Sequence, residues 1–145
     1  MLMNSIKISL CMIFGIAGAT LVKLFGGWTE DMVTLIIVMA IDFILGLIIA
    51  SVFKKSPKSK SGSMSSKSCF VGICKKATML LFVLVARRLD ISLGADYIKS
   101  AVVIAFIVNE LISIVENAGI IGIPMPKIII KAIDLLKEKE SEKDA

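Results

Sequence analysis

The chain has 145 residues, a net charge of +5 and no His, and 57% of its residues are hydrophobic. Soluble domains are only about 45–50% apolar even when Gly is counted, and here the apolar residues gather in long runs. The composition therefore argues against a soluble domain and predicts an integral membrane protein. It also excludes a catalytic His and a His-bearing metal site. Because a span needs about 20 residues, the length allows four or five spans at most.

The first apolar run covers residues 8–25. It has features of a signal peptide, because Lys7 precedes it and Ala17-Gly18-Ala19 has the spacing of a cleavage site. However, the apolar part of a signal peptide is only about 7–15 residues long, and this run is longer. We therefore expect a first helix that is retained in the membrane.

The second apolar run, residues 32–53, is the clearest span, and Asp42 is its only charged residue. Its length is sufficient to cross a hydrocarbon core of about 30 Å at 1.5 Å per residue. Only residues 26–31 separate it from the first run. So short a loop predicts that the two helices form an antiparallel hairpin.

Residues 54–68 form a linker with five Lys, seven Ser and no acidic residue. Such a composition cannot bury a core and predicts a flexible, solvated segment. Positively charged loops stay on the cytoplasmic side of a membrane, and each Lys near an anionic lipid surface contributes about 1 kcal/mol of attraction. We expect the linker to be cytoplasmic and to form a basic patch at the inner leaflet, made of Lys54, Lys55, Lys58, Lys60 and Lys67.

A weaker third segment covers residues 69–86 and contains Lys75 and Lys76. It predicts either a short span, whose charged ends extend to the two interfaces, or a helix lying in the interface. A fourth run covers about 98–115. Four spans agree better than three with the Lys residues that follow the fourth run, because the C-terminus is then cytoplasmic.

The C-terminal region predicts an amphipathic helix over residues 128–136, which suits the membrane surface. Alternating charges after it predict a frayed tail. The predicted fold is therefore all-α: an integral membrane protein with three to four transmembrane helices plus a C-terminal amphipathic helix. Its expected parts are a transmembrane hairpin, the linker, the later membrane segments, and the amphipathic helix with its tail, over residues 1–53, 54–68, 69–122 and 123–145.

Asp42 lies near the middle of the second run, where an ionised carboxylate costs about 2.5–3.5 kcal/mol to insert. Gly46 and Ala50 follow at helical spacing, so the three residues share a small, polar helix face. Such a face packs closely against another helix. It predicts either a pore-facing or oligomer-contacting stripe, or a single structural hydrogen bond between helices.

Similar stripes of small or polar residues occur in the first and fourth runs, and they indicate association of many helices. Nothing in the sequence indicates a catalytic site, a metal site, a bound cofactor or nucleic-acid binding, since no nucleophile has a His base and Cys11, Cys69 and Cys74 form no ligand cluster. The candidate assembly or pore-lining residues outside the Asp42 stripe are Gly15, Ala19, Ala105, Asn109 and Glu110.

Three stretches resemble the toxin-secretion and phage-lysis holin family of Gram-positive phages. They are DFILGLIIA at 42–50, SSKSCFVGICKKATMLLFVLVARRLD at 65–90 and NELISIVENAGIIGIPMPK at 109–127. Their order and spacing cover most of the chain, and the third stretch is the most specific.

The resemblance implies a protein of the bacterial cytoplasmic membrane that assembles with copies of itself. Such assemblies form lesions that depolarise the membrane and release an endolysin or a secreted toxin. Membrane lipids and that released protein would be its other partners. The family has no catalytic residues to carry over. Our own hypothesis assigns Asp42, Gly46, Asn109 and Glu110 to assembly or pore lining.

Two other functions fit the residues. A small exporter would use Asp42 for proton coupling, although the chain has no internal repeat. An antiholin would join the same oligomer and delay it, and the sequence does not separate a holin from an antiholin.

Overall fold

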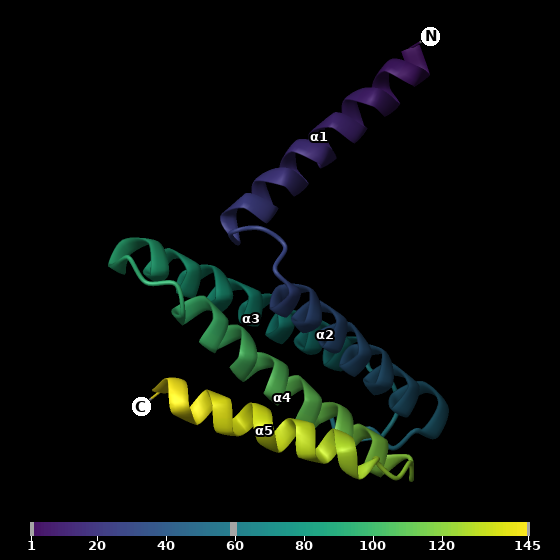
Figure 1. Cartoon of the computed structure of the whole chain (residues 1–145). Coiled ribbons are helices and arrows are strands. Elements are labelled where there is room, and N and C mark those ends of the chain that lie inside the picture. The colour runs from purple at the N-terminus through teal and green to yellow at the C-terminus, as the bar shows by residue number, and fades with distance from the viewer. Residues whose placement is uncertain (1, 59–60, 145) are drawn as a thin grey trace.

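The computed structural model describes residues 2–58 and 61–144. This part of the chain is built from helices joined by short turns and by the linker (Figure 1). A short π-helical turn, Ile49–Phe53, continues the second helix to the linker. The α-helices are α1 Leu2–Leu24, α2 Glu30–Ile48, α3 Ser66–Leu93, α4 Ile98–Ile120 and α5 Lys127–Asp144.

Four of these helices are long and apolar enough to cross a membrane. The weak third segment is a helix of 28 residues rather than the 18 of its apolar stretch, because it begins at Ser66 and continues past Arg87-Arg88 to Leu93. The prediction of an all-α membrane protein with three to four spans is confirmed, and the structure supplies four candidate spans. The chain is a multi-pass membrane protein.

Helices α2, α3 and α4 form a bundle with a common apolar core (Figure 1). Each helix turns its apolar stripe inward, so that Leu35, Val83 and Val103 are fully buried where the three meet. Helix α4 lies in the middle of the bundle and contacts α2, α3 and α5. The buried residues of this core are Met32, Leu35, Val38, Met39, Val83, Val103 and Ile107.

Truncation of Leu35 to Ala should destabilise the bundle by about 2–5 kcal/mol, because it leaves a cavity at a site with no exposed surface. The measurement is thermal unfolding of the purified protein in detergent. Ile37→Ala is the matched control, since Ile37 lies on the same helix but is 53% exposed. Equal losses for both variants would contradict the placement of the core.

The end of the bundle at the α3–α4 turn is tied together by polar side chains. Asp90 accepts hydrogen bonds from the backbone N–H groups of Ile98 and Lys99, both at 2.9 Å, and so caps the start of α4. The Lys99 ammonium donates to the Thr29 hydroxyl at 3.4 Å. These contacts join the starts of α2 and α4 to the end of α3.

Helix α1 stands away from the bundle (Figure 1). None of its apolar window is buried within the chain, so its side chains are available to lipid or to another helix. Gly26 and Gly27, with φ of +79° and +91°, form the turn between α1 and α2. The positive φ of Gly26 favours Gly at this turn, and the Arg87 side chain of α3 lies close to it, with Nε 2.6 Å from the place of a Cβ.

Helix α5 is longer than the amphipathic helix predicted over residues 128–136. It continues to Asp144. Lys and Glu, which dominate this tail, are good helix formers. Instead of standing free, α5 runs back along α4, with Ile133 only 6% exposed and Leu136 packed against the bundle core (Figure 1).

Candidate functional site

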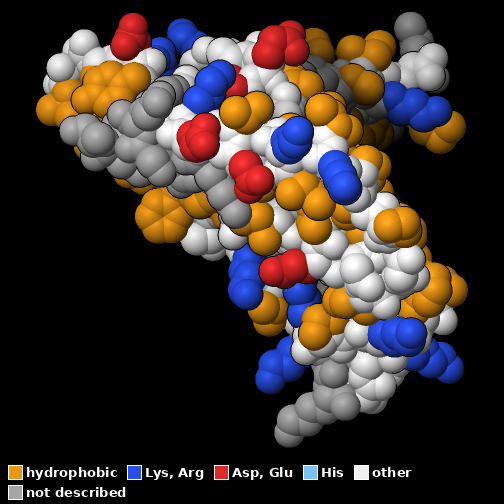
Figure 2. Space-filling model, turned by 60° about the horizontal axis from the view of Figure 1, so that its bottom comes forward, with side chains coloured by type: hydrophobic (Ala, Val, Ile, Leu, Met, Phe, Trp, Pro, Cys, Tyr) orange, Lys and Arg blue, Asp and Glu red, His pale blue; other side chains and the backbone are white. Residues whose placement is uncertain are grey.

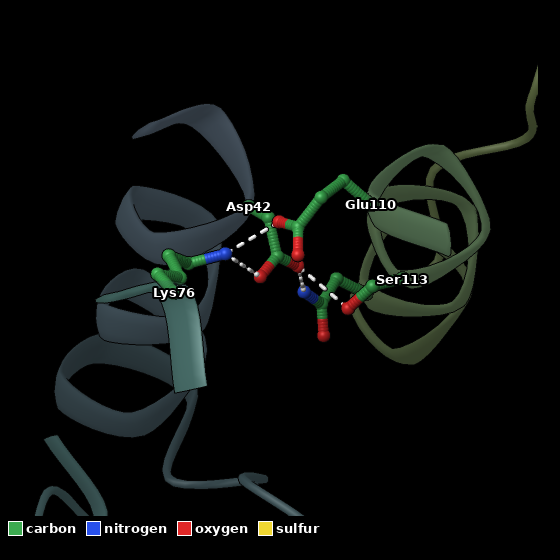
Figure 3. Close-up of polar contacts among 5 residues, drawn as sticks. Asp42, Lys76, Glu110 and Ser113 are labelled. Atoms are coloured by element: carbon green, nitrogen blue, oxygen red, sulfur yellow. Dashed lines mark hydrogen bonds and ion pairs between the residues drawn. The ribbon is translucent and has the colours of Figure 1, made fainter. Parts of the chain in front are cut away.

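Three charged side chains meet inside the bundle, one from each of its helices (Figure 3). The Lys76 ammonium on α3 lies 2.9 Å from Asp42 Oδ2 on α2, and it also pairs with Glu110 Oε2 on α4. Asp42 and Glu110 are 6% and 4% exposed. We call Asp42, Lys76 and Glu110 the charged triad.

The other oxygen of Asp42 is also satisfied, by two donors from α4. Asp42 Oδ1 accepts a hydrogen bond from Ser113 Oγ at 2.6 Å and one from Asn117 Nδ2 at 3.0 Å. Glu110, Ser113 and Asn117 are spaced at i, i+3 and i+7, so they lie on one face of α4, which is the face turned to α2. The Asp42 carboxylate therefore accepts hydrogen bonds from both neighbouring helices, α3 and α4.

The triad connects α2 and α3, which otherwise contact each other little, since most of their packing is against α4. Breaking a buried ion pair by removal of one partner typically costs about 3–5 kcal/mol, because the remaining charge stays buried without compensation. The two carboxylates and single ammonium leave a formal charge of −1 when all three groups are ionised. The triad is thus a polar connection that holds three membrane-spanning helices in one arrangement.

A cavity of about 390 Å³ lies beside the triad and extends toward the linker. Its floor is formed by Asp42, Lys76 and Glu110, and its wall along α2 and the π-helical turn by Gly46 and Ala50. Linker residues line its outer part, where the Ser56 N–H donates to the Gly62 carbonyl at 2.9 Å. The remaining polar side chains of the lining include Lys58, Ser65, Ser68, Lys75, Asn109 and Glu116.

The structure brings together some of the residues that the sequence singled out and separates others. Asp42 and Glu110 meet in the triad, and Gly46, Ala50 and the exposed Asn109 line the cavity beside it. Ala105 lies in a second hollow, between α3 and α4. Gly15 and Ala19 lie on the exposed surface of α1, remote from the triad. Four Lys of the proposed basic patch, Lys54, Lys55, Lys58 and Lys67, are exposed, and Lys60 lies outside the described residues.

Lys76 is the main residue that sequence reasoning missed. The sequence suggested that it extends toward the membrane interface, whereas in the structure it turns inward between two carboxylates. Asn117 and the partner role of Ser113 were missed as well. One signal was present in the sequence. A Lys inside an apolar run needs a charged partner, and the second and fourth runs each carry a central acid, Asp42 and Glu110.

The polar groups of the site pair with one another across α2, α3 and α4. Within residues 2–58 and 61–144, no group of three or more His, Cys, Asp or Glu is placed to hold a metal ion. Cys11, Cys69 and Cys74 are free thiols. The contacts that the structure shows at the site are ion pairs and hydrogen bonds.

Comparison with known proteins gives a consistent set of relatives. The sequence model of the bacteriophage holin family matches residues 19–138. An uncharacterised protein of Halalkalibacterium halodurans is 36% identical over 82% of this chain and 87% of its own length. An uncharacterised protein of Clostridium perfringens is 33% identical over 94% of this chain and 98% of its own length. A protein of Bacillus phage phi105 described as a probable holin is 29% identical over 76% of this chain and 78% of its own length. No solved structure matches the chain.

Proposed function

Because the chain belongs to the bacteriophage holin family, we propose that it is a holin that accumulates in the bacterial cytoplasmic membrane and then assembles into lesions. The lesions depolarise the membrane and release an endolysin or a secreted toxin. Copies of the same chain and membrane lipids are its direct partners, and it performs no enzymatic reaction.

The charged triad is the observation that carries this proposal. In the single chain its polar groups are paired with one another and turned away from lipid, so the protein can accumulate without opening the membrane. If the three helices separate, each carries a polar group in an apolar span. Lipid exposure of such a group costs about 2.5–3.5 kcal/mol, so the separated helices favour an arrangement in which these groups face water or the same groups of other copies.

The exposed apolar surface of α1 supports assembly. Gly15 and Ala19 lie four residues apart, and the place of a Cβ on Gly15 meets no other atom of the chain within 4 Å. Small residues at this spacing allow two membrane helices to approach closely. Gly46 and the buried Ala50 line the cavity inside the chain, so the small-residue surface exposed for assembly is that of α1.

The test is inducible expression in bacteria, with the membrane potential and the escape of a folded cytosolic reporter protein followed together. Delayed, abrupt depolarisation with reporter escape is the expected result. Depolarisation without escape would limit the lesions to small pores and contradict direct cargo release. Cells that stay polarised and grow would contradict the holin function. Delay of a known active holin on co-expression would then support an antiholin, and proton-coupled solute efflux would support an exporter.

The linker lysines should set the orientation of the spans. Replacement of its five Lys by Gln removes the strongest cytoplasmic signal, so the share of chains with the linker outside should rise from near zero to a measurable fraction. A protease site is placed in the linker, and the matching protease is added to intact spheroplasts. The fraction of chains that is cleaved measures the share with the linker outside. Replacement of five linker Ser by Gln is the matched control, and equal cleavage of both variants would contradict the orientation.

A further inference from the structure

Helix α5 packs beside α4, a candidate membrane span, although it carries many charges. It runs back antiparallel to α4 after a turn at Gly122 and two Pro residues, and it packs against α4 (Figure 1). Leu136 packs against the core that also contains Val103 and Ile107. At 1.5 Å per residue the 18 residues of α5 extend about 27 Å, close to the roughly 30 Å of a hydrocarbon core.

The opposite side of α5 is charged. The face of the molecule that carries α5 shows acidic and basic side chains interspersed among apolar ones (Figure 2). Ile133 is buried against the bundle, whereas every described charged side chain of the helix is exposed. These exposed charged residues are Lys127, Lys131, Asp134, Glu138 and Lys139.

Contact with lipid would destabilise the charged face of α5. A single charged side chain at the middle of a membrane helix costs about 2.5–3.5 kcal/mol, and α5 carries several with no ion pair among its described side chains. Two environments remain for the helix. Either it leaves α4 and lies at the membrane surface, or it stays on α4 and its charged face meets water inside the membrane.

We infer that in the assembled lesion α5 crosses the membrane against α4 and turns its charged face to the water that fills the lesion. The inference rests on the proposed function, and it identifies which surface of the chain lines the opening. The packing of Ile133 and Leu136 is retained, and only the exposed face changes its surroundings. Because that face carries both Lys and acidic residues, it presents no single sign of charge to a passing protein.

The experiment measures the depth and the water contact of one position on α5. The three Cys are replaced by Ala, and a nitroxide label is attached at Lys139→Cys in the full chain, reconstituted in phosphatidylglycerol-containing vesicles. Lys139 is 12 residues beyond Lys127, about 18 Å along the helix. Collisions with a water-soluble nickel chelate report water, collisions with oxygen report lipid, and spin-labelled lipids report depth. Dye release from the same vesicles reports lesions.

Two further label positions calibrate the measurement. Ile41→Cys lies on an exposed part of α2 next to the triad residue Asp42 and should read deep and rich in oxygen. Lys55→Cys lies in the exposed linker and should read shallow and rich in nickel collisions. The inference expects Lys139→Cys to combine the depth of Ile41→Cys with nickel collisions within about twofold of those of Lys55→Cys.

The other four outcomes contradict the placement of α5, the formation of lesions, or both. Leaking vesicles with the label at headgroup depth would place α5 on the surface and overturn the inference while the lesion stands. A deep label rich in oxygen and poor in nickel collisions would place the charged face in lipid and also overturn it. Intact vesicles with a deep, nickel-accessible label would contradict the lesion but retain the placement of α5. Intact vesicles with a headgroup-depth label would contradict both.

Discussion

Under the proposed function, Asp42→Ala should shorten the delay before depolarisation at equal membrane levels of the protein. The substitution removes the acceptor of three donors at once, Lys76, Ser113 and Asn117, which belong to α3 and α4. Loss of one partner from a buried ion pair costs about 3–5 kcal/mol, a large share of the 5–15 kcal/mol that holds a typical domain folded. A bundle weakened to this extent separates sooner, so the expected effect is a shorter delay before depolarisation.

The measurement is the interval between induction and depolarisation, with membrane levels matched by immunoblotting. Asp96→Ala is the control, because it removes the same charge from an exposed position in the α3–α4 turn. The delay for Asp42→Asn should lie between those of the wild type and Asp42→Ala. The Asn amide oxygen still accepts a hydrogen bond from Ser113 or Asn117, but Lys76 loses its ion pair with residue 42. Unaltered timing of Asp42→Ala would remove Asp42 from the mechanism.

Hydrophobic run lengths were enough to predict the membrane class and the first two spans. The second run, residues 32–53, is continuous helix in the structure, as α2 and the π-helical turn. The third span was the weak point, because an apolar stretch interrupted by Lys75 and Lys76 does not reach across a bilayer by itself. In the structure this stretch is part of a helix of 28 residues, and Lys76 pairs with two carboxylates on neighbouring helices. That pairing depends on tertiary packing and could not be predicted from the apolar run.

The same distinction separates the parts of the site that were predictable from those that were not. Asp42 and Glu110 stand out in a sequence because ionisable residues in apolar runs are rare and need partners. Their partners depend on how each helix is rotated about its own axis, and a small-residue stripe does not fix that rotation. The position of α5 was not predictable either, since its apolar face fits a membrane surface and the side of α4 equally well.

The size of the triad's contribution is best tested through Lys76. Lys76→Met removes the only cation of the triad and leaves Asp42 and Glu110 buried together with a formal charge of −2. An unpaired buried charge costs about 3–5 kcal/mol, which corresponds to a change of two orders of magnitude or more in a folding equilibrium at 1.4 kcal/mol per tenfold. The expected result is a strong fall in the amount of protein retained in the membrane.

Lys75→Met provides the control, because Lys75 is the exposed neighbour of Lys76 on the same helix. A second substitution then separates charge from shape. Glu110→Gln in the Lys76→Met background removes one of the two uncompensated anions, while Asp42 keeps its bonds from Ser113 and Asn117. Membrane levels and the unfolding temperature in detergent should therefore recover most of the way. A double variant no better than Lys76→Met would show that Lys76 acts by filling space, and charge balance in the triad would no longer explain how α3 is held in the membrane.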